Sequence, residues 1–276
     1  MDNEFFIHVD DTPKQLFVSR PKENGSKAFS PCDMTPEDVD YEMSTGKHPE
    51  ILQIIGMNQK SLEHFAKHYA QNYRYLYFFK CQTISDFSPL QDLKKLERVD
   101  IYWNIRSKQL WDFSGNTALK ALRILDAKQI TFNPSMLDTS PTLEDVTFWG
   151  SVFNNTPMEN LDVFGRMPAL KTLTLRNIRL KDKQVNFLAH AEKLKEFHFD
   201  AGMFTTEEIA WMVAKYPDLV GSCLGACSYH RCDTSLNDVR ICGFRKPSLD
   251  LPQHQKRLDK YIAEFDALVE KYRNEP

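Results

Sequence analysis

Apolar residues recur along this chain in one short template: an apolar residue, two variable residues, an apolar residue, one variable residue and a last apolar residue. The apolar positions of the copies are Pro49/Leu52/Ile54 in a degenerate first copy, then Tyr73/Leu76/Phe78, Leu96/Val99/Ile101, Leu119/Leu122/Ile124, Leu143/Val146/Phe148, Leu170/Leu173/Leu175 and Leu194/Phe197/Phe199. Successive copies begin 24, 23, 23, 24, 27 and 24 residues apart. A fixed period of about 20 to 30 residues is typical of a solenoid, in which each unit buries its apolar face against its neighbours.

Each unit is expected to hold a short strand, a turn, and a helix or helical turn on the outer side. Apolar residues at helical spacing predict helices over residues 61–69, 183–189 and 206–214. The segment 133–140 is shorter and contains Pro134, which favours a turn in that unit. Because strands stack more closely than helices, the array is expected to curve with its strands on the concave side.

Residues 1–48 do not follow the template and are expected to form an N-terminal cap. Two strand-like runs, at residues 5–7 and 15–18, are separated by turn-forming residues. Thr35 and Pro36 followed by acidic residues predict the start of a helix. A strand pair and a helix here would shield the first repeat, because an open solenoid end exposes apolar core and unpaired strand edges.

The array is expected to span residues 49–218 and a C-terminal cap residues 219–276. Leu219 fits the start of an eighth copy, but Ser222 stands where the next apolar residue belongs. One strand is predicted near Val239. Residues 253–274 predict an amphipathic helix that packs on the last repeat, with self-association through its apolar stripe as the alternative.

The template resembles the leucine-rich repeat, and the chain is similar to bacterial-type intracellular leucine-rich repeat proteins. The resemblance implies an α/β right-handed solenoid (a horseshoe), with parallel strands on the concave face and helices or turns on the convex face. It also implies protein–protein recognition. The chain departs from the family at the ninth position, where asparagine normally bonds the turning backbone: only Asn104 fits, and the other slots hold Cys81, Ala127, Ser151, Ile178 and Gly202.

Side chains alternate between the faces of a strand, so template positions three, five and seven should point away from the core. Position seven holds five consecutive large apolar residues, where solvent favours polar ones, and the far end of the face is polar. Such a patch predicts a binding site for a protein or peptide. The predicted binding residues are Tyr75, Tyr77, Phe79, Tyr102, Leu125, Trp149, Arg176, His198 and Asp200. As an alternative, residues 1–48 fold over this row and bury it.

Composition narrows the class of partner. Lys plus Arg number 35 against 38 for Asp plus Glu, a balance that argues against nucleic-acid binding, which needs a basic excess. The first residues lack the basic segment of a signal peptide, and no apolar run approaches the roughly 18 residues of a membrane span. We therefore expect a cytoplasmic protein with reduced cysteines and no membrane partner. A monomer is favoured, with the oligomeric state open.

Two clusters invite a chemical interpretation. Cys223, Cys227, His230 and Cys232 lie within ten residues, but four zinc ligands in one short loop are sterically awkward, and we predict no metal. His198 lies between Glu196 and Asp200 on one face, an arrangement that could suggest acid–base catalysis. Thr174 is the one neighbouring nucleophile, and a strand surface offers no enclosing pocket, so we interpret the cluster as ion pairs or as the polar half of a binding face.

Phosphate-loop, dinucleotide, nucleophile-elbow and zinc-protease motifs are absent from the sequence. We expect no catalytic residues and no cofactor. The partner is an unidentified protein or peptide, or, as an alternative, a carbohydrate stacked on the aromatic row.

Overall fold

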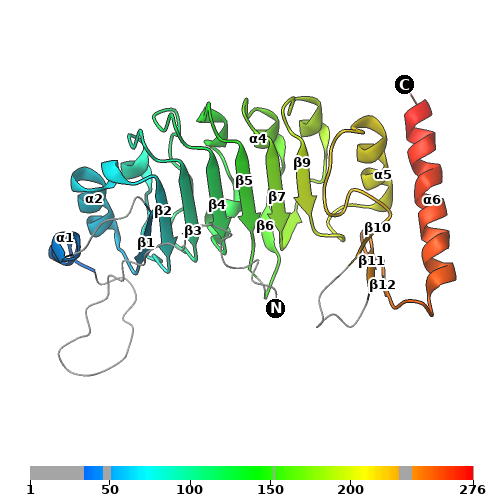
Figure 1. The fold of residues 1–276 in the computed structure, drawn as a ribbon, viewed down its shortest axis with the longest axis horizontal. Helices are drawn as coiled ribbons and strands as arrows, with labels where there is room; N and C mark the ends of the chain where they lie inside the picture. The colour runs from blue at the N-terminus through cyan, green and yellow to red at the C-terminus, as the bar shows by residue number, and fades with distance from the viewer. Residues whose placement is uncertain (1–33, 46–50, 152, 230–237, 276) are drawn as a thin grey trace.

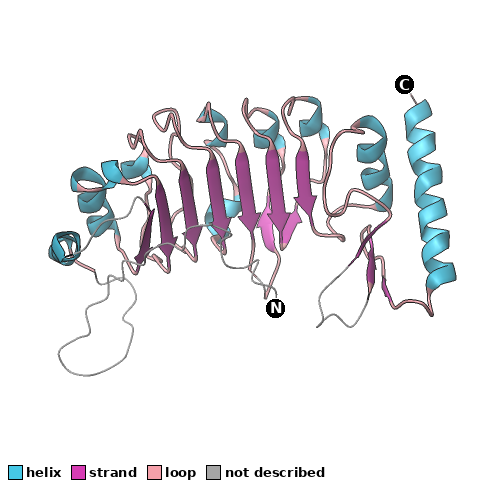
Figure 2. Ribbon diagram, viewed as in Figure 1, coloured by secondary structure: helices cyan, strands magenta, loops and turns pink. Residues whose placement is uncertain are grey.

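Seven short strands form one parallel sheet whose order follows the chain (Figure 1, Figure 2). The computed structural model describes residues 34–45, 51–151, 153–229 and 238–275. The strands are β1 (Ile51–Ile55), β2 (Tyr75–Phe79), β3 (Arg98–Tyr102), β4 (Ala121–Leu125), β5 (Asp145–Trp149), β7 (Thr172–Arg176) and β9 (Glu196–Phe199). The chain therefore has the architecture of an α/β repeat solenoid.

The register of the sheet confirms the alignment predicted from the template. Ile51 pairs with Tyr75, Tyr75 with Arg98, and the third template position stays in line through to Glu196. The fourth and sixth positions of every strand are buried, each with no more than 1% of its surface exposed. Positions three, five and seven consequently lie together on the other side, which we call the sheet face.

Five of the seven strands end in the same tight turn at template position eight. Gly56, Lys80, Trp103, Asp126 and Asn177 all have φ between 48° and 72° there. On each of the first four, the backbone N–H donates to the position-seven carbonyl of the next strand, as from Lys80 to Tyr102 at 3.0 Å. Four of the five are not glycine, so these turns hold side chains in a conformation that costs about 1–2 kcal/mol each.

Asn104 bonds the turning backbone as the leucine-rich repeat pattern implies. Its buried amide nitrogen donates to the carbonyls of Cys81 (2.9 Å) and Ile84 (2.8 Å). Its oxygen accepts from the backbone N–H groups of Arg106 and Ser107. At Cys81, the thiol takes part of this role by donating to the carbonyl of Ile54 at 3.6 Å.

The outer side carries short helices and a second, two-stranded sheet. These elements are α2 (Gln59–His68), α3 (Lys128–Phe132), α4 (Asp162–Gly165), α5 (Thr206–Lys215), the 3-10 turns η2 (Ala70–Asn72), η3 (Ser88–Leu90), η4 (Leu137–Thr139) and η5 (Asn186–Ala189), and the strands β6 (Thr156–Met158) and β8 (Ile178–Leu180). The helices predicted at 61–69 and 206–214 are confirmed, as is the turn at 133–140. Within the segment predicted at 183–189, the helical part is the 3-10 turn η5 over Asn186–Ala189, which follows β8 in the same unit.

At the N-terminal end, α1 (Pro36–Thr45) begins where the sequence predicts it. The hydroxyl of Thr35 accepts from the N–H of Asp38 (3.2 Å), and the carboxylate of Asp38 accepts from the N–H of Thr35 (2.9 Å). The Asp40 carboxylate also bonds His64 of α2 and Tyr69, which fixes α1 on the first repeat. The strand pair expected at 5–18, and Pro49, lie outside the described residues.

At the C-terminal end, β10 (Cys227–Tyr229), β11 (Val239–Ile241) and β12 (Ser248–Leu249) form a small antiparallel sheet, of which the sequence predicted only the middle strand. The predicted tail helix is α6 (Gln255–Asn274), which lies along α5 (Figure 1). Leu258, Phe265 and Val269 of its apolar stripe are buried within the chain. None of the described helices has the length and apolar character needed to cross a membrane.

Candidate functional site

A row of large apolar side chains crosses the sheet face at template position seven. We call this set the apolar row: Ile55, Phe79, Tyr102, Leu125 and Trp149. The register places them side by side on five adjacent strands, and each remains partly exposed. Phe79 contacts Tyr102 with ring centroids 5.2 Å apart, and Tyr77 lies 6.1 Å from Phe79. The side chains of the predicted row therefore lie next to one another on the sheet face, each partly exposed.

Lys80 and Trp103 extend this row at its edge. The Lys80 ammonium lies 5.0 Å from the centroid of the Phe79 ring and 5.3 Å from that of Trp103. Trp103 is 39% exposed although its backbone is left-handed. Trp103 therefore adds exposed apolar surface beside the row and is not part of the buried core.

Tyr75 differs from the other predicted binding residues because it is buried. Only 5% of its surface is exposed, and its hydroxyl donates to Oδ2 of Asp100 at 2.6 Å. The Arg98 guanidinium lies 4.8 Å from the centre of its ring. Burial, followed by the negative charge of Asp100, raises the pKa of Tyr75 well above its usual value. Tyr75 thus supports its neighbours and offers no free surface.

Next to the apolar row lies a cluster of opposite charges that the sequence pattern did not reveal. Arg98 bonds Asp100 through Nε at 2.9 Å and through its terminal nitrogen at 2.8 Å, with side chains 18% and 3% exposed. Both oxygens of Asp100 are therefore engaged. The signal was present in the sequence as Arg98 and Asp100 two residues apart on one face, but spacing alone does not show burial.

Arg123 and Asp145 complete this central charge cluster but are less well satisfied. Among the described residues, the buried Nε of Arg123 has no hydrogen-bond partner. No ion pair within 4.0 Å joins the two residues in the described part of the chain. Burial raises the pKa of Asp145, against the lowering effect of Arg123 and Arg98. The four charges sum to zero, and two of them have hydrogen-bonding capacity left for a partner.

The polar end of the sheet face brings Arg176, His198 and Asp200 together, as predicted. The Arg176 guanidinium contacts the Asp200 carboxylate at 3.4 Å and the Ser222 hydroxyl at 3.2 Å. Nδ1 of His198 accepts from the N–H of Ser222 (3.3 Å), so its Nε2 is the nitrogen that donates to Glu196 (3.2 Å). Both ring nitrogens of His198 are thereby engaged in bonds within the chain.

Asp200 has a structural role that the sequence did not suggest. Oδ2 of its carboxylate accepts from the backbone N–H of Asn177 at 2.6 Å. On the preceding strands this position-eight N–H donates to a backbone carbonyl instead, as Gly150 does to Arg176 at 2.8 Å. The side chain of Asp200 therefore completes the ladder of turns where the backbone no longer does.

Asp200→Ala is expected to lower the free energy of unfolding by about 1–2 kcal/mol, because it leaves the Asn177 N–H without its charged acceptor. Asp200→Asn keeps an acceptor oxygen and should cost less. Denaturant unfolding of the two variants beside the wild type measures both effects. Equal stability of Asp200→Ala and the wild type would contradict this role.

Three of the four described cysteines lie at the C-terminal end, away from the apolar row, whereas Cys81 lies in the second repeat. Cys223 and Cys242 are buried neighbours, and Cys227 is half-buried. The hydrogen bond between the first two lowers the pKa of Cys223 and raises that of Cys242. His230 and Cys232, the other members of the sequence cluster, lie outside the described residues. Within the described part of the chain, no three His, Cys, Asp or Glu side chains group as a metal site would require.

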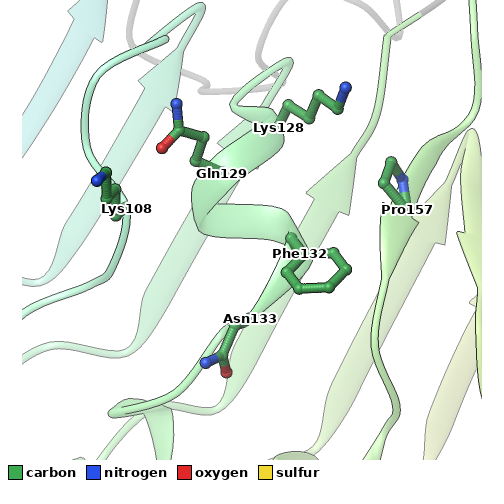
Figure 3. Close-up of a pocket in the computed structure, with 6 residues that line it drawn as sticks. All are labelled: Lys108, Lys128, Gln129, Phe132, Asn133 and Pro157. Carbon is green, nitrogen blue, oxygen red and sulfur yellow. The ribbon is translucent and has the colours of Figure 1, made fainter.

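A hollow of about 490 Å³ lies on the outer side, beside α3 and β6 (Figure 3). Sequence reasoning missed it because its residues come from different repeats and show no common motif. It is lined by Lys108, Lys128, Gln129, Phe132, Asn133 and Pro157.

No family model matches the chain, and no curated protein matches it. Internalin C2 of Listeria monocytogenes is a similar solved structure, with 17% identity over 68% of this chain and 73% of its own, at a TM-score of 0.39. An internalin (inlF) of the same organism has 21% identity over 54% of this chain and 47% of its own, at a TM-score of 0.33. Internalins are leucine-rich repeat proteins. These likenesses concern the fold only; the template, the in-register parallel sheet and the bonding of Asn104 define the chain as a repeat solenoid.

Proposed function

We propose that this chain is a non-enzymatic interaction module that holds a protein or peptide segment along its sheet face. The observation that carries the proposal is the apolar row: five adjacent strands each present a large apolar side chain that stays partly exposed. Contiguous apolar surface of this kind on a folded domain usually marks an interaction site.

The anchors of the proposed site are Tyr77, Phe79, Tyr102, Leu125 and Trp149. Aromatic anchors combine large rigid area with a low cost in conformational entropy. Arg123 and Asp145 suit a polypeptide because a peptide group offers both an acceptor for a guanidinium and a donor for a carboxylate. Arg176, His198 and Asp200 would contact the partner from the polar end, and their existing bonds hold them in place for it.

We propose further that the sheet face is the concave side of a right-handed horseshoe. In this arrangement residues 49–218 form the array, and residues 1–48 and 219–276 shield its two ends. The packing of α1 on α2 and of α6 on α5 supports the shielding. A cytoplasmic location belongs to the same proposal and rests on the sequence alone.

The test begins with a random peptide library selected on the immobilised wild-type chain. Selected peptides are then measured against the double variant Tyr102→Ala/Trp149→Ala. We expect their affinity to fall by at least about 30-fold, because about 2 kcal/mol is the loss expected for even a single central aromatic anchor. Phe153→Ala/Tyr229→Ala is the matched control, because it removes two exposed aromatic side chains outside the row.

Three outcomes would count against the proposal. Equal loss of affinity in the control would show that the row has no special role. A loss of several kcal/mol in the stability of Tyr102→Ala/Trp149→Ala would identify the row as core. Tryptophan fluorescence changes with oligosaccharides, in the absence of any selected peptide, would favour carbohydrate binding instead.

A further inference from the structure

We propose that the outer hollow is a second binding site, which takes an acidic polypeptide segment carrying apolar side chains. It lies on the side that holds α3 and β6, and no residue of the apolar row lines it (Figure 3). The inference is therefore independent of the proposed function of the sheet face.

The lining of the hollow combines apolar side chains and amides. Phe132 at the end of α3 and Pro157 in β6 provide the apolar part, which we call the floor, and Gln129 and Asn133 on the segment of Phe132 provide the amides (Figure 3). The side-chain nitrogen of Gln129 donates to the carbonyl of Ile105 at 3.1 Å, which places Ile105 next to α3. Ile105 is 51% exposed and adds an apolar shoulder.

Four cations surround this floor. Lys108 and Lys128 line the hollow, and both are exposed. Arg179 is the register partner of Pro157 in the small parallel sheet. The Lys181 ammonium lies 4.5 Å from the centroid of the Phe132 ring. Three different repeats thus direct positive charge to one place.

These cations lack carboxylate partners in the described part of the chain. By contrast, Arg74 pairs with Glu97 at 2.7 Å, Arg166 with Asp138 at 2.7 Å and Lys171 with Glu144 at 2.8 Å. The acids closest to the four cations in sequence are Asp112, Asp126 and Asp182, and Glu159 follows β6, where its backbone N–H donates to the Phe132 carbonyl at 3.0 Å. In the described part of the chain none of these acids forms an ion pair with the four cations, and Asp182 accepts from the N–H of Gln184.

Charge and shape together select the ligand class. The chain as a whole carries a net charge of −3, yet four cations without ion pairs in the described residues lie around one apolar hollow, and such a grouping fits an anionic partner. A flat bilayer does not enter a hollow. Stacked nucleobases need open aromatic faces, and Lys181 already covers one face of Phe132. An acidic segment with an apolar side chain can pair its carboxylates with the surrounding cations and pack its apolar side chain against Phe132 and Pro157.

The test uses a fluorescent short peptide of alternating glutamate and leucine, with a glutamine–leucine counterpart and single-stranded oligothymidylate as comparison probes. Lys108→Glu/Lys128→Glu reverses the charge of the hollow at two exposed positions. Lys60→Glu/Lys67→Glu on α2 makes the same change in net charge elsewhere on the surface. Circular dichroism and thermal melting establish that both variants fold.

We expect saturable binding of the acidic peptide, weakened about tenfold or more by Lys108→Glu/Lys128→Glu and unchanged by the α2 control. The glutamine counterpart should bind more weakly than the acidic peptide. Equal loss in both variants would overturn the proposal, as would tighter binding of oligothymidylate or no saturable binding of the acidic peptide. The Tyr102→Ala/Trp149→Ala variant should bind this probe like the wild type, which separates the hollow from the sheet face.

Discussion

Replacing Arg98 with methionine is expected to lower the free energy of unfolding by about 3–5 kcal/mol. The substitution removes the two bonds that Arg98 donates to Asp100. In the described part of the chain, the Tyr75 hydroxyl is then the one group that still bonds this carboxylate, which is 3% exposed. A buried charge that loses its counter-charge is costly, because the protein interior solvates it poorly. Guanidinium denaturation, followed by tryptophan fluorescence, measures the change.

Arg74→Met provides the matched control. Arg74 makes a similar two-point bond to Glu97, but the two side chains are 51% and 42% exposed, so the loss should stay below about 1 kcal/mol. The double variant Arg98→Met/Asp100→Leu removes both buried charges and should recover part of the lost stability. An equal effect of Arg98→Met and Arg74→Met would contradict the burial of the Arg98–Asp100 pair.

The second large effect is expected at Asn104, where alanine should cost about 3–4 kcal/mol. Its side chain donates to two carbonyls and accepts from two backbone N–H groups, and the residue is 1% exposed. Alanine leaves several buried backbone groups unsatisfied, and each costs about 1–3 kcal/mol when no water reaches it. Thermal unfolding and denaturant midpoints of the variant report the loss.

Two further variants define what is lost at Asn104. Asn104→Asp retains the accepting oxygens but loses the donated bonds to Cys81 and Ile84, so it separates the two halves of the network. Asn154→Ala changes the same residue type at an exposed position and should leave stability within about 0.5 kcal/mol of the wild type. If Asn104→Ala unfolded at the same midpoint as Asn154→Ala, the bonding role of Asn104 would be wrong.

The template predicted the order and register of the parallel sheet, because its period places one strand in each unit and its apolar positions set how neighbouring strands align. Position one marks the approach to each strand, and positions four and six fix which face is buried. A shift of one residue would have exposed every core side chain, so only one register is compatible with the pattern. The alignment of Phe79, Tyr102 and Trp149 followed from that register alone.

Other features depend on contacts between units and have no signature within any single copy. The burial of Tyr75 and Asp100 arises from side chains on neighbouring strands. The outer hollow joins Lys108, Lys128 and Pro157 from three repeats. The pairing of β8 with β6 was missed for the same reason, since helical spacing at 183–189 indicates the turn η5 but not a strand contact between units.

The repeated position-eight turn also bears on how a chain of this kind changes length. Lys80, Trp103 and Asp126 each donate a backbone N–H to the position-seven carbonyl of the next strand. A repeat unit inserted between any two of these strands could therefore make the same backbone bond to the strand on each side. Each duplication would lengthen the sheet face by about 4.8 Å. That freedom ends at Asn177, whose N–H is held by the Asp200 side chain. Insertion of repeat units is thus compatible with the backbone bonding of the middle strands, but not with that of the turn after β7.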